Sequence, residues 1–244
     1  MTMSADGKRI FYSEAVYVVG VVVLAVGTAL VERAGFGVSM VVAPAYLLHL
    51  KLSAVFPAYT FGVSEYVLQA VLLLALSLLL RRFKKGYLFS FLTAFFYGCV
   101  LDISISALSA CAALLPAFSE DFAAFSLAGR LALYFAGLLV TASGVSLLFH
   151  TYLPPEAYEL FVKEVSGHFG LRLDKVKTAY DCISLLTSIA LSFLFFGFGQ
   201  FRGIGAGTVF CALVNGRLIG KIGAFLEARC TFRDALPWRD FFSR

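Results

Sequence analysis

Residues 11–226 contain one three-helix pattern written twice, about 118 positions apart. Matched residues mark the two copies: Gly27 with Gly144 near the end of a first helix, Glu65 with Asp181 at the start of a second, and Gly98 with Gly216 inside a third. Because each copy holds an odd number of membrane spans, the copies must cross the membrane in opposite directions. The sequence therefore predicts two inverted-topology repeats, at about residues 11–108 and 129–226.

The composition places these helices in a membrane. Hydrophobic residues make up 60% of the 244 residues, charged residues make up 14%, and the mean hydropathy is +0.88. A water-soluble domain of this size cannot bury so much apolar surface. A bilayer core about 30 Å thick takes roughly 20 apolar residues per span, and six such stretches are predicted, at 11–31, 61–80, 88–108, 131–150, 180–199 and 203–226. We expect an all-α membrane protein with one membrane domain over residues 1–244.

The distribution of Lys and Arg predicts the orientation of the spans. With the N-terminus inside, fourteen of these residues lie near the inner side and four near the outer side. Such an excess is typical of cytoplasmic loops, so both termini are expected in the cytoplasm. The net charge of +5 then reflects contact with anionic headgroups. The predicted partner is the lipid bilayer, and no nucleic acid is expected.

A short helical segment is predicted after the first span of each repeat. Residues 34–57 are apolar but are interrupted by Pro44 and Pro57, and residues 153–170 open with Pro154-Pro155-Glu156. Such segments are too short to cross a bilayer and suit a re-entrant or interfacial position. In the second segment, Leu160, Phe161 and Val165 are expected to face the membrane or the bundle, with Glu159, Lys163 and Glu164 toward water.

Two matched carboxylates, Glu65 and Asp181, stand at the predicted starts of the second and fifth spans. An ionisable residue inside a span costs several kcal/mol unless it has a partner or a cavity. The pair is therefore interpreted either as a gate or as a site for a cation or protons. The alternative is that each carboxylate lies at the headgroup boundary, where the helix dipole stabilises it.

Three further polar residues lie deeper in the third and sixth spans. Asp102 and Arg217 are predicted to pair, either as a structural lock or as a substrate clamp, and Asn215 lies two residues before Arg217. The glycine-rich stretch from Arg202 to Thr208 joins spans five and six. It suits close helix packing, or an anion held by Arg202 and a bare helix N-terminus.

Catalytic, metal and cofactor sites are not predicted. The five cysteines show no CxxC spacing, and the three histidines occur singly. No Ser/His pair, paired acids or metal-ligand cluster stands out, so we do not expect an enzyme.

The chain resembles the YitT/YczE-type bacterial membrane proteins. The likeness rests on Arg33-Ala34-Gly35-Phe36-Gly37-Val38-Ser39, Phe96-Tyr97-Gly98 with Asp102, Tyr180-Asp181 and the glycine-rich stretch before Thr208. It covers most of the chain and implies a six-span protein of the bacterial inner membrane, of a family usually suspected of transport. Met40 follows Ser39 where related chains often have Pro, and Asn215 and Arg217 stand where relatives look more apolar.

Three functional hypotheses follow. The first is a secondary transporter of a small organic solute that works by alternating access and is driven by a proton or cation gradient. Its predicted substrate-binding or ion-binding residues are Glu65, Asp102, Asp181, Asn215, Arg217 and Arg202, and the arginines with Lys221 favour an anion. The second is the substrate-capture subunit of an energy-coupling importer, which would dock a partner helix on Ala25 and Ala29. The third is an intramembrane enzyme, and a homodimer stays open for each.

Overall fold

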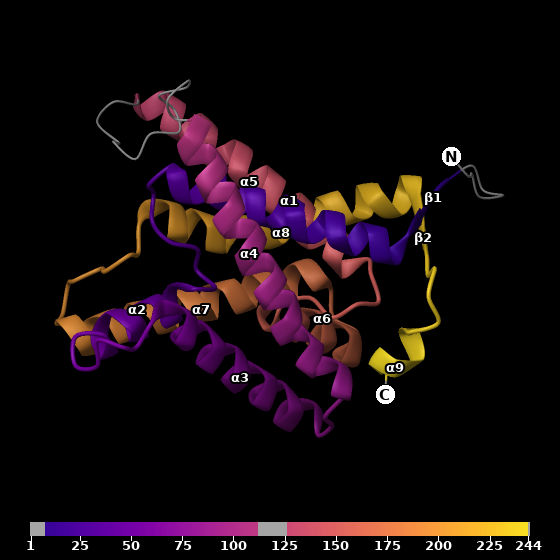
Figure 1. The fold of residues 1–244 in the computed structure, drawn as a ribbon, viewed down its shortest axis with the longest axis horizontal. Coiled ribbons are helices and arrows are strands. Elements are labelled where there is room, and N and C mark those ends of the chain that lie inside the picture. The colour runs from indigo at the N-terminus through magenta and orange to yellow at the C-terminus, as the bar shows by residue number, and fades with distance from the viewer. Residues whose placement is uncertain (1–7, 112–125, 244) are drawn as a thin grey trace.

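The computed structural model describes residues 8–111 and 126–243 of the chain. Helices dominate this part, and two short strands pair beside them (Figure 1). The elements in chain order are β1 (Arg9–Tyr12), α1 (Ser13–Arg33), α2 (Ala43–Leu52), α3 (Phe61–Leu80), the 3-10 turn η1 (Lys85–Leu88), α4 (Phe89–Cys111), α5 (Leu127–Phe149), α6 (Ala157–Phe169), α7 (Leu173–Phe196), α8 (Ala206–Arg229), β2 (Cys230–Arg233) and α9 (Arg239–Ser243).

Six helices in the described ranges are long and apolar enough to cross a membrane: α1, α3, α4 with η1, α5, α7 and α8. The six predicted spans are thus confirmed as helices. The largest error in their bounds is in the fifth, which begins at Leu173 rather than at residue 180. Asp174, Lys175 and Lys177 lower the hydropathy of its first two turns, although helix α7 already includes them. Asp181 is therefore two turns inside α7 and not at its start.

The centre of the bundle is the crossing of α1 and α5, where glycines bring the two backbones together. A methyl group on Gly144 would lie 2.5 Å from the backbone nitrogen of Leu24, and one on Gly27 would collide with the backbone of Thr141. Such a close approach is open to glycine because it has no Cβ. Around this crossing Tyr17, Val21, Leu24 and Ala142 form part of the main hydrophobic core.

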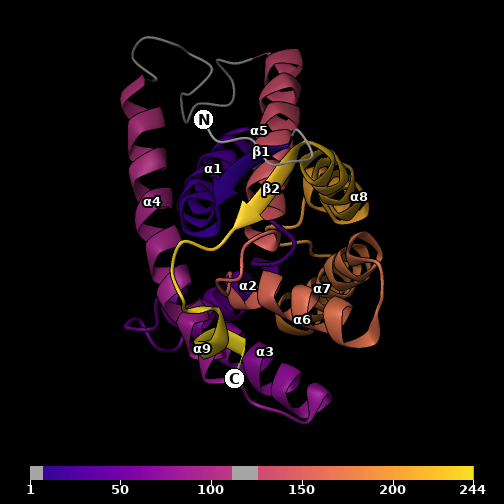
Figure 2. The same cartoon turned by 90° about the vertical axis from the view of Figure 1, so that its right-hand side faces the viewer.

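The remaining helices pack in pairs around α1 and α5. Helix α1 contacts α4 and helix α5 contacts α8, while α2 and α6 each contact both α3 and α7. Figure 2 shows α1, α5 and α8 above α3, α6 and α7, with α4 along one edge. Helix α7 also packs on α8, where Gly216 lies against Thr178.

The short helices α2 and α6 occupy the two segments predicted from the sequence. Leu160 of α6 is buried against Leu73 and Leu76 of α3, as expected. The expectation that Glu159 faces water is wrong, because only 5% of this residue is exposed. The amphipathic pattern of α6 did not indicate that its N-terminal turn enters the protein.

Both ends of the described chain lie at the same end of the bundle. Strand β1 pairs in parallel with β2, with Arg9 opposite Cys230. The Glu14 carboxylate accepts hydrogen bonds from the backbone nitrogens of Ala235 and Leu236, which ties the C-terminal segment to the start of α1. Figure 1 shows α2 at the opposite end.

Candidate functional site

A buried group of charged side chains lies where α3, α6 and α7 meet. Its members, called the acidic cluster below, are four carboxylates and one lysine: Glu65, Glu156, Glu159, Asp181 and Lys177. Two consecutive helices, α6 and α7, and the more distant α3 supply them. Glu65 is on α3, Glu156 and Glu159 lie at and just inside the start of α6, and the remaining two are on α7.

Lys177 is the only base in the acidic cluster. Its ammonium nitrogen lies 2.9 Å from Oδ1 of Asp181 and 3.5 Å from Oε1 of Glu159. Lys177 is 1% exposed and Asp181 is fully buried. The spacing of four residues along α7 places this lysine and Asp181 one above the other on one helix face. Asp181 therefore does not cap the start of α7.

Glu65 joins the cluster through α6. The Tyr158 hydroxyl donates a hydrogen bond of 2.6 Å to Oε2 of Glu65, and Tyr158 itself is 1% exposed. Gln69, one turn further along α3, lies beside the same carboxylate. The matched residues Glu65 and Asp181 thus both reach the N-terminal turn of α6, where Glu159 interacts with each of them.

Several oxygen atoms at this site are buried without a hydrogen-bond partner among the described residues. They are Oε1 of Glu65, Oε1 of Gln69, Oε1 of Glu156, Oδ2 of Asp181 and Oδ1 of Asn215. Buried polar atoms are normally hydrogen-bonded, and those that are not call for an explanation. A proton on one carboxylate would let it donate to an oxygen of a neighbour, which removes two such atoms at once.

The acidic cluster has more negative than positive charge. With every group ionised, four carboxylates face one lysine, and an unpaired buried charge costs far more than protonating the group. Burial, strengthened by Glu159 and Glu65, raises the pKa of Glu156 well above its usual value. In the described residues no three His, Cys, Asp or Glu side chains are placed to hold a metal ion. The surplus of buried carboxylates over lysine therefore suits bound protons.

The predicted pair between Asp102 and Arg217 does not form. Asp102 is exposed on α4, and Arg217 is exposed on α8 and forms no ion pair with any described residue. Helix α4 packs on α1 while α8 packs on α5 and α7, so the two helices are held apart. Matching positions in two repeats do not by themselves predict that the two side chains lie close together.

Asn215 and Arg202 have different outcomes. Asn215 of α8 is buried beside Asp181 and so belongs to the surroundings of the acidic cluster. Arg202 is exposed and lies over the ring of Phe196. At the start of α8, two of the backbone N–H groups considered for an anion are used by the chain itself. Gly207 donates its backbone N–H to the carbonyl of Phe36, and Gly205 donates to Thr208.

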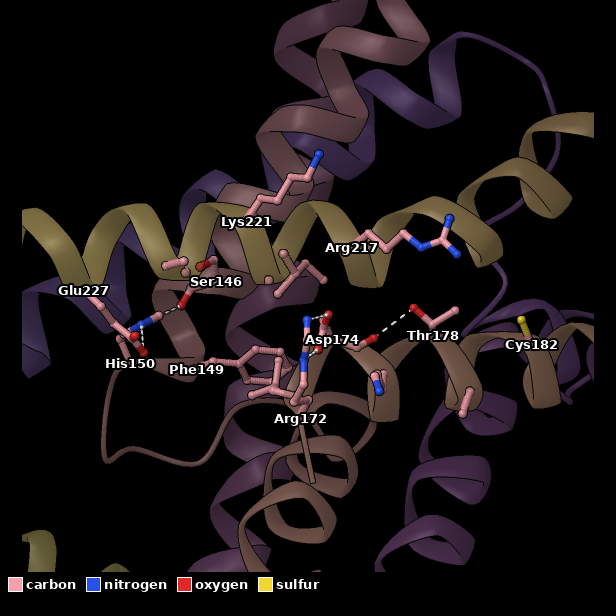
Figure 3. Close-up of a pocket in the computed structure, with 17 residues that line it drawn as sticks. Ser146, Phe149, His150, Arg172, Asp174, Thr178, Cys182, Arg217, Lys221 and Glu227 are labelled. Atoms are coloured by element: carbon pink, nitrogen blue, oxygen red, sulfur yellow. Dashed lines mark hydrogen bonds and ion pairs between the residues drawn. The ribbon is translucent and has the colours of Figure 1, made fainter. Parts of the chain in front are cut away.

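A separate cleft of about 960 Å³ lies between the end of α5, the start of α7 and the middle of α8. Figure 3 shows Arg217 and Lys221 on α8, with Arg172 and Asp174 approaching from the start of α7. Arg172 pairs with Asp174 at 2.7 Å, and His150 lies 3.3 Å from Glu227. The cleft is distinct from the acidic cluster, because no member of the cluster lines it.

Four residues in and beside the acidic cluster were not predicted as site residues: Lys177, Glu156, Glu159 and Tyr158. One signal was present, because Lys177 and Asp181 are separated by four residues in a stretch that reads as the edge of a span. Lys177 was counted among the inner-loop residues, which hid that spacing. The burial of Glu156 and Glu159 follows from the position of α6 and has no signal in the sequence.

Comparison with known proteins gives one match. A model described as "Family of unknown function (DUF6198)" matches residues 11–223. The chain belongs to this family. No curated protein and no solved structure matches it. The resemblance to the YitT/YczE-type proteins is not addressed by the DUF6198 match and stays a prediction.

Proposed function

We propose that this DUF6198 protein is a proton-coupled secondary transporter of a small organic solute, in which the acidic cluster carries the proton. The observation that carries the proposal is the burial of Glu156, Glu159, Asp181 and Lys177 between α6 and α7, with the half-buried Glu65 of α3 beside them. Ionisable groups inside a membrane domain are expensive and commonly mark ion or proton pathways. Both termini are then cytoplasmic in the bacterial inner membrane.

The contacts between α1 and α5 support an arrangement of two inverted repeats. Gly27 packs on Thr141 and Gly144 packs on Leu24. Gly27 and Gly144 are 117 positions apart, as are Leu24 and Thr141. Each contact is therefore the image of the other, as expected when a two-fold axis relates two antiparallel helices.

A second set of contacts repeats the same relation. Gly20 packs on Leu148 and Gly137 packs on Val31, and both matched pairs are again 117 positions apart. Two hydrogen bonds have a similar arrangement at slightly different spacings. Thr208 donates to the carbonyl of Val38, and Thr93 donates to the carbonyl of Pro154, with the donors 115 and the acceptors 116 positions apart.

The two halves differ in one respect that suits alternating access. In the second half, Gly216 packs against Thr178 and so closes α8 on α7. A methyl group on the matched Gly98 of α4 would meet no heavy atom of the described residues within 4 Å. A transporter built from inverted repeats exposes its site alternately when the halves exchange such arrangements. We propose that α4 closes on α3 through Gly98 in the opposite state.

The capture-subunit hypothesis receives less support. Ala25 and Ala29, the residues that would dock a partner helix, have no exposed surface in this chain. An acid-rich centre also has no evident use in a subunit whose energy comes from a separate ATPase. The transporter is therefore the function that we favour.

The first step of the test is to find the solute. Compounds that bind the folded state raise its melting temperature, so a metabolite panel is screened in detergent at pH 5 and at pH 8. Hits are then offered to proteoliposomes with an imposed proton gradient. Uptake against a solute gradient that a protonophore abolishes is the expected result.

Neutral variants of the acidic cluster decide the assignment. Asp181→Asn and Glu65→Gln are expected to lose gradient-driven accumulation while they keep solute exchange, because only proton coupling is removed. Asp234→Asn is the matched control, since this carboxylate lies outside the cluster and pairs with Arg239. Unchanged accumulation in Asp181→Asn and Glu65→Gln would show that the acidic cluster does not couple protons to transport.

A further inference from the structure

The cleft between α5, α7 and α8 carries positive charge that no described residue neutralises. Arg217 and Lys221 are exposed on adjacent turns of α8, and Lys175 lines the same cleft from α7. None of the three forms an ion pair with a described residue. The two acids that line the cleft are already engaged, Asp174 by Arg172 and Glu227 by His150.

Unpaired cations are unusual at the position where two of these residues lie, which is inside a candidate membrane span. Arg217 is in the middle of α8, which is one of the six candidate spans, and Lys221 follows four residues later. An Arg or Lys near the centre of a span costs about 2.5–3.5 kcal/mol in insertion measurements unless it has a partner or reaches water. Figure 3 shows both side chains pointing away from Arg172 and Asp174, so neither is paired with the acid at the start of α7.

The walls of the cleft are largely apolar. Phe149, Leu173 and Ile219 line it together with the small residues Gly220 and Ala224. A ligand that fits these surroundings has an anionic group for the basic side chains and an apolar body for the walls. Phosphate suits such a set, because Arg binds its oxygens in a bidentate way and Lys binds it as a point charge.

We propose that this cleft binds a phosphate group attached to an organic body, held by Arg217, Lys221 and Lys175. The group can belong to the headgroup of an anionic lipid or to a soluble phosphate ester. The proposal does not depend on transport, because it rests on the cleft and not on the acidic cluster.

The test measures the melting temperature of the purified full chain in neutral detergent at constant ionic strength. One arm adds short-chain phosphatidylglycerol, with phosphatidylcholine as its comparison. The other arm adds glycerol 3-phosphate, with chloride as its comparison. Stabilisation in the first arm alone assigns a lipid headgroup, and stabilisation in the second assigns a soluble ester.

The variants are Arg217→Gln combined with Lys221→Gln, and Lys175→Gln alone. Both α8 residues are exposed, so the double variant is expected to fold. Each basic contact with an anionic headgroup gains about 1 kcal/mol, which makes the double variant roughly tenfold or more weaker in binding. Arg229→Gln combined with Arg233→Gln removes the same charge outside the cleft and is expected to bind like the wild type.

Two results would overturn the proposal. One is a wild-type protein that neither phosphate probe stabilises beyond its comparison compound. The other is an equal loss of stabilisation in the control double variant, which would mean that general charge and not the cleft attracts the probe.

Discussion

Replacement of Lys177 is expected to cost far more stability than replacement of its partner Asp181. In an isolated ion pair, replacing either partner lowers the free energy of unfolding by a similar amount. In the acidic cluster they differ, because Lys177→Met removes the only positive charge from among four carboxylates, while Asp181→Asn removes one of the surplus negative charges.

The magnitude follows from the geometry. At an effective dielectric constant of about 20, a unit charge pair at the 2.9 Å separation of Lys177 and Asp181 attracts by about 6 kcal/mol, and the 3.5 Å contact with Glu159 adds about 5 kcal/mol. Desolvation offsets most of this attraction. Removal of one partner of a buried pair typically costs about 3–5 kcal/mol, which is the loss expected for Lys177→Met. Relief of repulsion with Glu159 should hold Asp181→Asn to about 1–2 kcal/mol.

The assay is equilibrium unfolding of the purified protein in mixed detergent micelles at neutral pH. Arg172→Met and Asp174→Asn serve as the matched control, because Arg172 of this pair at the start of α7 is exposed, so replacing either partner should cost much less stability than Lys177→Met. Equal losses for Lys177→Met and Asp181→Asn would refute the reasoning, since they would mean that the pair behaves as an isolated salt bridge.

Three further predictions concern pH and the glycines. Burial beside Glu159 raises the pKa of Glu156 above 4.5, so the folded state binds this proton more tightly than the unfolded state, and stability should fall as pH rises above about 4.5. A plot of melting temperature against pH from 4 to 8 should be flatter for Glu156→Gln than for the wild type. An unchanged slope would contradict this. Gly27→Val should lower the free energy of unfolding by about 3 kcal/mol or more, because the larger side chain forces α1 away from α5. Gly167→Ala, whose methyl group would meet no described atom within 4 Å, should stabilise α6 by about 0.5–1 kcal/mol. Equal melting temperatures for the two variants would argue against the close crossing of α1 and α5. Gly98→Leu should leave the melting temperature nearly unchanged yet stop solute uptake in proteoliposomes, and normal uptake would exclude closure of α4 through this position.

The helices were predictable because their cause is local. A run of about 20 apolar residues must be helical in a bilayer, since its backbone has no other hydrogen-bond partner. The short helices were indicated by prolines that interrupt an apolar stretch. The start of α7 was placed seven residues too late, because its first turns carry Asp174, Lys175 and Lys177. Both lysines were interpreted as residues of a cytoplasmic loop, but Lys177 is buried in the protein.

The site was predictable only in part, because it is made of residues that tertiary packing brings together. Glu65 and Asp181 stood out as acids within apolar segments, and both lie in the acidic cluster. Glu156 and Glu159 looked like surface acids of an amphipathic helix. Their burial depends on where α6 packs against α3 and α7, which no local pattern specifies.

The central claim is that the acidic cluster holds protons at neutral pH, and infrared spectroscopy measures this most directly. The carbonyl stretch of a protonated carboxylic acid is resolved from the bands of carboxylates. We predict a buried protonated carboxyl band in the wild type at pH 7 that weakens in Glu156→Gln and persists in Asp234→Asn. A spectrum with carboxylate bands only, unchanged in every variant, would contradict the account.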